Sequence, residues 1–223
     1  MTPDLIAEAN AGLRRQSPLE IVRWAVNHAN GRAIVSTNFR PYEAVLLHLC
    51  VQVQPDIPVL WVDHGYNRPA TYRHAEQLRQ LLRLNLKAYL PKISAAHRDA
   101  IQGPIPTPAD EPGLKRFSAL MKLEPFQRAM KELGPRVWIT ALRRVQNPNR
   151  AELEIVSADR NFNTLKVSPL FHWTDADMES YLEQNRLPNE WDYFDPAKAD
   201  EKRECGLHAA WGGNAVLTGG AGI

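Results

Sequence analysis

The sequence predicts an α/β fold in which a parallel sheet carries helices on both faces. Amphipathic helical segments alternate with short apolar segments, and this βαβα order is typical of a parallel sheet. The segment IPVLWVD at 57–63 is apolar at successive positions, as a strand buried on both faces requires. The 223 residues, of which 44% are hydrophobic, are enough for one sizeable core. We therefore expect ligands at the carboxyl ends of the strands.

The elements can be placed in chain order from local signals. The segment at 17–30 begins with Ser17 and Pro18, a combination that starts helices, and its apolar residues recur mostly at helical spacing. Pro41 suits the first turn of another helix, and Gly134 suits a helix end. Helices are expected at 17–30, 41–53, 69–85 and 117–134, and strands at 32–37, 57–63, 86–91 and 136–144.

Two stretches depart from the repeating pattern. Residues 103–113 contain four prolines and two glycines, which favours an irregular surface loop. Residues 209–223 are rich in glycine and alanine, whose ordering costs much backbone entropy. We expect a single domain over 1–208 and a loosely ordered tail at 209–223.

Charge, hydropathy and cysteine content argue against several classes of protein. The net charge of +2 is too small for a nucleic-acid groove, and no segment approaches the roughly 18 apolar residues of a membrane span. The first residues lack the basic start and apolar run of a secretory signal. Two cysteines cannot form a disulfide framework. We expect a cytoplasmic protein with neither nucleic acid nor a membrane as its partner.

Polar residues follow three predicted strands, at the edge where such sheets bind ligands. The stretch STNFR at 36–40 precedes a helix, whose N-terminus attracts anions, although no glycine-rich cradle is present. Asp63 in VDHGY could accept a hydrogen bond from a ribose or a base. Arg143 and Arg144 in ALRR offer guanidinium forks to phosphate or sulfate. The alternatives are helix caps for the first two sites and a solvated surface for the arginine pair.

The two cysteines stand in different surroundings. Cys50 lies within the apolar segment LLHLCVQV and is expected in the core. Cys205 lies in KRECGLH, where Lys202, Arg203 and His208 could stabilise a thiolate. This surrounding is typical of a nucleophile, although a cysteine beside lysines also occurs by chance.

Several segments together resemble the phosphoadenylyl-sulfate reductases. LNLKAYLP, KLEPFQRAMKELG, ALRR and KRECGLH occur in that family's order and spacing, and PDIPVLWVDHGY followed by PATYR resembles its Asp-x-Gly-Tyr turn. KVSPLFHWTDADMESYLEQNRLP resembles its later strand and helix, and the Glu-Cys-Gly-Leu-His signature is highly specific. The resemblance runs from about Ser36 to His208 and implies an adenine nucleotide alpha hydrolase-like, Rossmann-like fold.

The resemblance also implies a reaction. The Cys205 thiolate would attack the sulfur of 3′-phosphoadenylyl sulfate, leaving a cysteine S-sulfonate and adenosine 3′,5′-bisphosphate, and thioredoxin or glutaredoxin would then release sulfite in sulfate assimilation. The resemblance places the substrate among Ser36, Thr37, Asn38, Phe39, Asp63, Gly65, Tyr66, Arg143, Arg144, Lys202, Arg203 and His208.

Cofactors and partners follow from the same comparison. Family members with an iron–sulfur cluster use two cysteine pairs, which this chain lacks, so no bound cofactor is expected. The expected partners are the sulfonucleotide, thioredoxin or glutaredoxin, and a second copy of the chain in a homodimer.

The sequence also departs from the family pattern. Arg40 and Pro41 stand where the family's first loop has a glycine, His64 replaces a small hydroxyl residue, and only 17 residues separate Leu187 from Cys205, because a Gly-Asp-x-His-Thr-Thr-Arg segment is missing. Two alternatives therefore stay beside the reductase: an enzyme of the same fold with another adenylylated or sulfonated substrate, and a nucleotide-binding regulator or assembly subunit.

Overall fold

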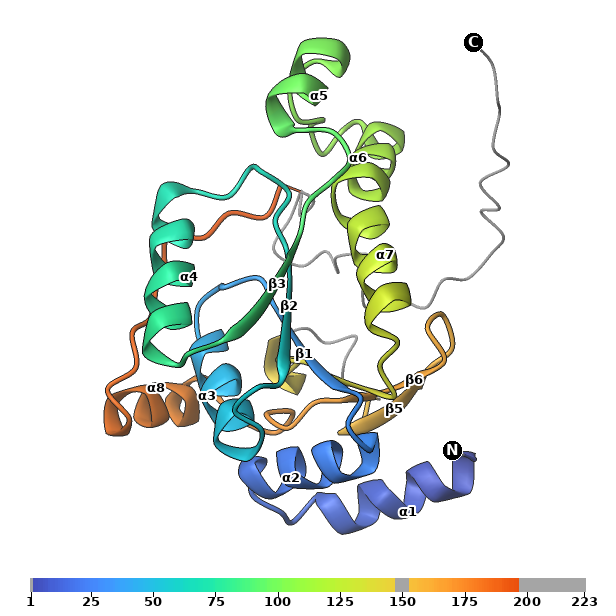
Figure 1. Ribbon diagram of the computed structural model, residues 1–223, viewed down its shortest axis with the longest axis vertical. Coiled ribbons are helices and arrows are strands. Elements are labelled where there is room, and N and C mark those ends of the chain that lie inside the picture. The colour runs from blue at the N-terminus through green and yellow to red at the C-terminus, as the bar shows by residue number, and fades with distance from the viewer. Residues whose placement is uncertain (1, 147–152, 197–223) are drawn as a thin grey trace.

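The computed structural model describes residues 2–146 and 153–196 and is built on one six-stranded sheet (Figure 1). The strand order is β3-β2-β1-β4-β6-β5, and all neighbours are parallel except β5 and β6. The strands are β1 (Ala33–Thr37), β2 (Pro58–Val62), β3 (Asn85–Tyr89), β4 (Val137–Ile139), β5 (Val156–Asp159) and β6 (Thr164–Val167). The expected parallel sheet is therefore confirmed, with one antiparallel edge strand added.

Helices cover both faces of the sheet, as the sequence predicts (Figure 1). They are α1 (Pro3–Leu13), α2 (Pro18–Ala29), α3 (Glu43–Val53), α4 (Pro69–Leu81), α5 (Ala95–Gln102), α6 (Glu111–Ser118), the π-helix η1 (Ala119–Leu123), α7 (Glu124–Leu133), the 3₁₀ turn η2 (Arg144–Gln146) and α8 (Asp175–Gln184). None of the described helices is long and apolar enough to cross a bilayer.

Two hydrophobic cores explain why the strands are apolar at successive positions. Val35 of β1 belongs to the larger core, which also contains residues of α2, α3 and α8. Its neighbour Ile34 belongs to the smaller core, where it joins Phe126 of α7 and Trp138 of β4. Successive side chains of a strand point to opposite faces, so a sheet covered on both faces needs apolar residues at both.

Several predicted boundaries were wrong, and local backbone geometry explains them. The helix expected from Pro41 begins at Glu43, because Tyr42 adopts a left-handed conformation with φ of 72°. The helix expected to reach Asn85 ends at Leu81, and Arg83 turns the chain with φ of 52°. The strand expected at 136–144 is confined to β4.

The proline-rich stretch is also shorter than expected. Asp110 accepts a hydrogen bond from the Gly113 amide at 2.9 Å and so caps α6, which makes 111–113 helical. The helix expected at 117–134 is interrupted by η1 and continues as α7. The boundary predicted between 208 and 209 lies outside the described residues.

The topology creates a switch point at one edge of the sheet. β1 lies between β2 and β4, so the chain proceeds from β1 to one side of the sheet and later returns to the other side. In open parallel sheets, ligands bind at such a switch point, beside the carboxyl ends of the strands. The loops after β1, β2 and β4 therefore define the candidate site.

Candidate functional site

The loop after β1 is organised around a buried carboxylate, Glu43, the first residue of α3. Its Oε2 accepts hydrogen bonds from the Thr37 hydroxyl and the Asn38 amide, both at 2.7 Å. Its Oε1 lies 3.1 Å from Nε of Arg40. A negative charge is favourable at a helix N-terminus. The donors predicted to bind phosphate thus already hold an anion, supplied by the protein itself.

The two remaining residues predicted in this loop face the cores. The side chain of Phe39 is buried at 1% exposure and packs edge-on against Trp61, with ring centroids 5.1 Å apart. The Ser36 hydroxyl accepts a hydrogen bond from Nε1 of Trp138 at 2.7 Å, on the side of the smaller core. Of STNFR, Thr37, Asn38 and Arg40 therefore remain around Glu43 at the carboxyl end of β1.

Asp63 organises the loop after β2. Its Oδ1 accepts hydrogen bonds from the Gly65 amide at 3.0 Å, the Asn67 side-chain amide at 3.0 Å and the Tyr72 hydroxyl at 2.8 Å. Burial, followed by the hydrogen bond to Asp63, raises the pKa of Tyr72 to about 12. Asp63 thus fixes the loop in addition to any contact that its second oxygen makes with a ligand.

Gly65 and Tyr66 join this loop to α5. Gly65 has φ of +77°, and a Cβ built on it would lie 3.1 Å from Cβ of Ala95, so only glycine fits without strain. The Tyr66 hydroxyl donates to Oδ1 of Asp99 at 2.5 Å. A hollow of about 340 Å³ beside α5 is lined by Asp63, His64 and Gly65 among others, and Tyr66 fastens this loop to α5 through Asp99.

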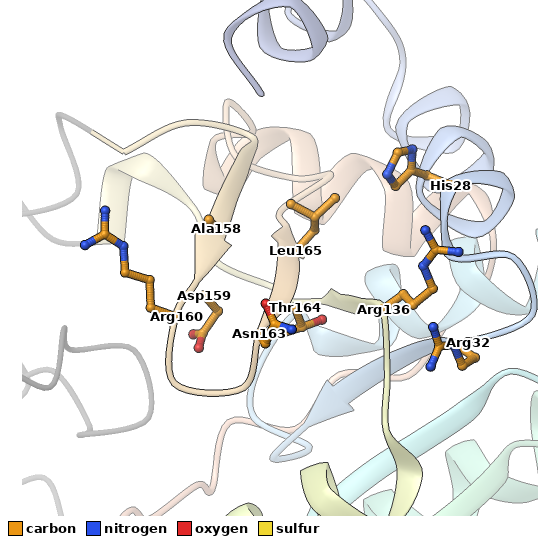
Figure 2. Close-up of a pocket in the computed structure, with 9 residues that line it drawn as sticks. All are labelled: His28, Arg32, Arg136, Ala158, Asp159, Arg160, Asn163, Thr164 and Leu165. Carbon is orange, nitrogen blue, oxygen red and sulfur yellow. The ribbon is translucent and has the colours of Figure 1, made fainter. Parts of the chain in front are cut away.

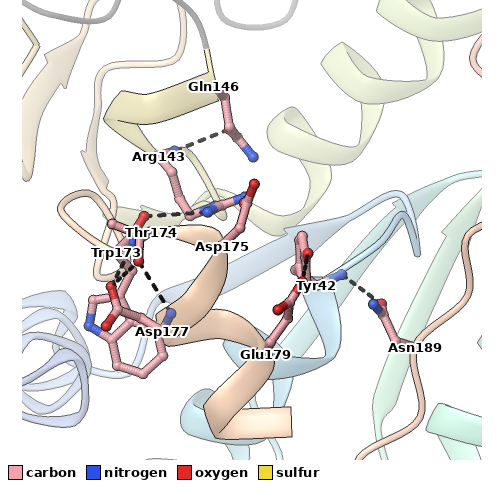
Figure 3. A network of polar contacts seen from close by, with 9 residues as sticks. All are labelled: Tyr42, Arg143, Gln146, Trp173, Thr174, Asp175, Asp177, Glu179 and Asn189. Carbon is pink, nitrogen blue, oxygen red and sulfur yellow. Dashed lines mark hydrogen bonds and ion pairs between the residues drawn. The ribbon is translucent and has the colours of Figure 1, made fainter.

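Arg143 holds the loop after β4 against α8 (Figure 3). Its guanidinium is 5% exposed, lies 2.7 Å from Oδ1 of Asp175 and donates to the Trp173 carbonyl at 3.3 Å. It also stacks over the ring of Tyr42, with the guanidinium carbon 5.3 Å from the ring centroid. Arg143 therefore uses its charge within the fold, a role that the sequence analysis did not assign to it.

Tyr42 extends the same network to the loop after β1 (Figure 3). Its hydroxyl donates to Oε1 of Glu179 at 2.9 Å, and its amide donates to Oδ1 of Asn189 at 2.8 Å. Burial, followed by the contact with Glu179, raises the pKa of Tyr42 to about 12. Two of the three loops at the edge are thereby fixed to α8.

Arg144 is placed differently from its neighbour. Its amide donates to the Phe171 carbonyl at 2.8 Å, which fixes the backbone, whereas its side chain is exposed. Within residues 2–146 and 153–196 its guanidinium has no partner. Of the predicted arginine pair, Arg144 is thus the one available to a ligand.

The segment at 189–196, called the crossing segment below, contacts the loops after β1 and β2 and the π-helix η1. Trp191 packs edge-on against Tyr42 of the loop after β1, with ring centroids 5.2 Å apart. Asp192 forms an ion pair with Arg68, in the loop after β2. Asp195 binds Lys122 of η1. Figure 1 shows this part of the chain leaving α8 and running beside α4.

The end of the crossing segment is held by a buried ion pair. Nζ of Lys122 lies 2.8 and 2.7 Å from the two carboxylate oxygens of Asp195, and both side chains are 4% exposed. His64 lies close to this pair and is also buried, at 4% exposure. Burial, with the charge of Lys122 as a smaller cause, lowers the pKa of His64 to about 4, so the imidazole is neutral at pH 7.

The remaining predicted residues divide between the core and the part of the chain that is not described. Cys50 is fully buried in α3, as expected, and burial raises the pKa of its thiol. Cys205, Lys202, Arg203 and His208 lie outside the described residues. Within the described ranges no three histidine, cysteine or acidic side chains gather as a metal site would require.

Sequence reasoning missed the residues that act over long distances. Glu43 carried a weak signal, since an acidic residue often opens a helix. Lys122 and Asp195 carried none, because they are 73 residues apart in the sequence.

Comparisons with known proteins agree on one family. The model of the phosphoadenosine phosphosulfate reductase domain matches residues 32–191. A phosphoadenosine 5′-phosphosulfate reductase of a Synechococcus species is 35% identical and aligns over 91% of this chain and 97% of its own. One of Xanthomonas oryzae is 37% identical, over 89% and 90%.

Solved structures show the same likeness. A phosphoadenylyl-sulfate reductase from Candida auris, solved as a phosphate complex, is 25% identical and superposes with a TM-score of 0.74 over 85% of this chain and 89% of its own. An FMN adenylyltransferase from Candida glabrata, 16% identical, superposes with a TM-score of 0.51 over 77% of this chain and 56% of its own, which shows a shared fold. This confirms the predicted adenine nucleotide alpha hydrolase-like fold, and the chain belongs to the phosphoadenosine phosphosulfate reductase family.

Proposed function

We propose that this chain is a thiol-dependent reductase that converts 3′-phosphoadenylyl sulfate to sulfite and adenosine 3′,5′-bisphosphate. The observation that carries the proposal is the path of the crossing segment, which leads from α8 over the loops after β1 and β2 to η1. Cys205 follows ten residues after Asp195. Ten residues reach at most about 35 Å, so the thiol can return to the edge where the sulfonucleotide would bind.

The first chemical step transfers the sulfonyl group. The Cys205 thiolate attacks the sulfate sulfur, forming an S–S bond, while the bond between sulfur and the bridging oxygen breaks. Its electron pair leaves with adenosine 3′,5′-bisphosphate. A nearby cation lowers both the thiol pKa and the repulsion between two anions. Lys202 and Arg203 supply cations beside the thiol in sequence, and Arg144 supplies one on the loop after β4.

The second step consumes two electrons from a dithiol protein. A thiolate of reduced thioredoxin or glutaredoxin attacks the sulfur of Cys205, and sulfite leaves with the electron pair of the broken S–S bond. The second thiol of the donor resolves the mixed disulfide, which returns Cys205 to its thiolate and leaves the donor oxidised. The reaction needs no metal and no bound redox cofactor.

The structure suggests how the nucleotide would be received. The Asn38 amide and Thr37 hydroxyl are held by Glu43, so a phosphate at this loop would have to share or displace that carboxylate. Asp63 and Gly65 line the neighbouring hollow, where the ribose and base would lie, and Tyr66 would hold this loop in place. Arg144 would bind the phosphosulfate, with Arg143 fixing the loop that carries it.

The test is sulfite release with reduced thioredoxin, measured separately with 3′-phosphoadenylyl sulfate and adenylyl sulfate. The parent is expected to release sulfite from the former and to carry a sulfonate on Cys205 when the donor is omitted, as peptide mass spectrometry would show. Cys205→Ser should lose both, whereas Cys50→Ala, the matched control, should keep both because Cys50 is buried in the core.

The two alternatives give different results in the same assay. Binding of the nucleotide without turnover of either substrate would favour a regulator or an assembly subunit. Absence of both binding and turnover would favour an enzyme with another adenylylated or sulfonated substrate. Sulfite release by Cys205→Ser at the parent rate would exclude the proposed nucleophile.

A further inference from the structure

A second polar cavity lies at the opposite edge of the sheet, where the parallel strands begin. Its volume is about 330 Å³, at the lower end of the range for small-molecule sites. Its lining comes from Arg32 before β1, Arg136 before β4, Thr164 at the start of β6 and His28 of α2. The candidate site occupies the carboxyl ends of the same strands, so the two sites are separated by the length of the sheet.

Two arginines are held together by the backbone at this edge. The Arg136 amide donates to the Arg32 carbonyl at 2.9 Å, and the Leu165 amide donates to the Arg136 carbonyl at 2.9 Å. Figure 2 shows the side chains of Arg32, Arg136 and His28 on one side of the cavity. In the part of the chain that the structure describes, neither guanidinium has an acidic partner.

His28 lies close enough to Arg136 to be affected by its charge. Its imidazole stacks on Trp24 at 5.1 Å, which fixes the ring. Burial lowers the pKa of His28, and the charge of Arg136 lowers it further. The positive charge of this edge is therefore felt inside the cavity.

The one acidic residue that lines the cavity is already neutralised. Oδ2 of Asp159 lies 3.1 Å from Nζ of Lys166, and its Oδ1 accepts hydrogen bonds from the amides of Asn161 and Phe162. Arg160 also lines the cavity, but Figure 2 shows its guanidinium directed away from the other two arginines. Asp159 thus leaves the charge of Arg32 and Arg136 uncompensated.

A buried hydroxyl provides an independent indication of a ligand. Thr164 lines the cavity and is 5% exposed, and its Oγ1 has no hydrogen-bond partner among the described residues. Buried polar atoms without a partner are rare and costly in native proteins. Asn163, beside it, adds a side-chain amide to the same wall of the cavity.

We propose that this amino-edge cavity binds a tetrahedral oxyanion, either inorganic phosphate or sulfate or the phosphate group of a nucleotide. Arg32 and Arg136 would supply the charge-assisted hydrogen bonds, and Thr164 would donate its free hydroxyl. Guanidinium groups match the geometry of such oxyanions. The proposal rests on residues that take no part in the proposed reduction, so the two can fail independently.

The experiment is calorimetric titration of the full chain with sodium sulfate, sodium phosphate and adenosine 3′,5′-bisphosphate, with sodium chloride keeping the ionic strength constant. Arg136→Ala is expected to raise the Kd for sulfate and phosphate about tenfold or more, the effect of a lost charge-assisted hydrogen bond. Arg73→Ala, the matched control, removes an exposed arginine of α4 and should change nothing. Arg144→Ala identifies any binding at the carboxyl edge of the sheet, because only that part of the signal should weaken in this variant.

Thr164→Val gives the sharpest test, because it keeps the shape of the side chain and removes only the hydroxyl. If the hydroxyl donates a hydrogen bond to the bound anion, the variant should bind sulfate and phosphate more weakly. Its unfolding temperature in chloride should not fall, because the hydroxyl has no hydrogen-bond partner among the described residues to lose. The ring resonance of His28 should move during a sulfate titration of the parent and not of Arg136→Ala.

The arms also identify the source of the anion. If part of the adenosine 3′,5′-bisphosphate binding is lost in Arg136→Ala but kept in Arg144→Ala, the amino-edge cavity binds a nucleotide. If the cavity binds sulfate but no such part of the nucleotide binding is found, its ligand is an inorganic ion. The proposal is overturned if the parent binds none of the three at this edge, or if Arg136→Ala and Thr164→Val bind them as the parent does.

Discussion

Asp195→Asn should detach the crossing segment from η1 and destabilise the whole chain. Lys122 and Asp195 are both 4% exposed, with Nζ 2.7 and 2.8 Å from the two carboxylate oxygens. The substitution keeps the size of the side chain but leaves the ammonium of Lys122 buried without a counter-charge. Breaking a buried pair in this way costs about 3–5 kcal/mol.

The second ion pair of the crossing segment is too weak to compensate. The side chains of Arg68 and Asp192 are 52% and 48% exposed, and an exposed ion pair contributes about 0–1 kcal/mol. Arg68→Ala is therefore the matched control and should lower the free energy of unfolding by less than about 1 kcal/mol. Asp195→Asn should lower the melting temperature by about 6–20 °C, at 2–4 °C per kcal/mol for a chain of this size.

The assay is urea unfolding followed by far-ultraviolet circular dichroism, combined with hydrogen exchange of peptides from 189–196. Exchange should accelerate in Asp195→Asn and remain near the parent rate in Arg68→Ala. The double variant Lys122→Met with Asp195→Leu removes both charges and should recover most of the lost stability. A free energy of unfolding within 1 kcal/mol of the parent for Asp195→Asn, with unchanged exchange, would refute the role of this pair.

Three further substitutions separate roles within the fold and the site. Arg144→Ala should weaken binding of adenosine 3′,5′-bisphosphate or phosphoadenylyl sulfate by about 1.5–3 kcal/mol in calorimetry and leave the melting temperature unchanged. Arg143→Ala removes a buried side chain together with its contact to Asp175 and should lower the melting temperature; the reverse pattern would contradict the assignment. Because the pKa of His64 falls to about 4 on folding, the unfolded chain binds its proton more readily, so stability should fall by about 3 kcal/mol as the pH drops from 6.5 to 4; His64→Asn should remove that part of the pH dependence, and an unchanged profile would contradict it. Cys50→Ser places a hydroxyl in the core and should cost about 1–3 kcal/mol in urea unfolding, and a cost near zero would mean that the hydroxyl finds a partner.

Local patterns predicted the sheet because burial on both faces leaves a strong signal in the sequence. The strand expected at 57–63 matches β2 within one residue at each end, since Val59 to Val62 are all buried. The hairpin of β5 and β6 left a weak signal. It is short, it carries Asp159 and Thr164 at its end, and its turn depends on Asn163 in a left-handed conformation with φ of 50°.

Element boundaries failed where the backbone turns without glycine or proline. Arg83 ends α4 with φ of 52°, a conformation that favours glycine or asparagine, so the sequence gives no stop signal there. The π-helix η1 continues the apolar periodicity of its neighbours and cannot be distinguished from an α-helix by spacing. Lys122, which binds Asp195 of the crossing segment, lies in this π-helix.

Positions near the ends of strands could be predicted for the site, but their partners could not. The sequence places Arg143 and Arg144 after a strand and predicts the same role for both. The partner that distinguishes them, Asp175, lies 32 residues beyond Arg143, and the Thr174–Asp177 capping box orients its turn (Figure 3). Tertiary contacts of this kind are invisible to a pattern of neighbouring residues.

The different surroundings of these two arginines would suit the ligand role proposed for the exposed one. A lone exposed arginine loses much of its side-chain entropy when it binds, and a loose backbone would add to that cost. Arg143 removes the cost of ordering the backbone, because the contacts of its buried side chain with Asp175 and the Trp173 carbonyl fix the loop before a ligand arrives. The Arg144 amide, bound to the Phe171 carbonyl, fixes the backbone one residue further on. The buried arginine thus positions the exposed one, so a substitution at Arg143 should weaken ligand binding through the loop even though its own guanidinium faces the protein.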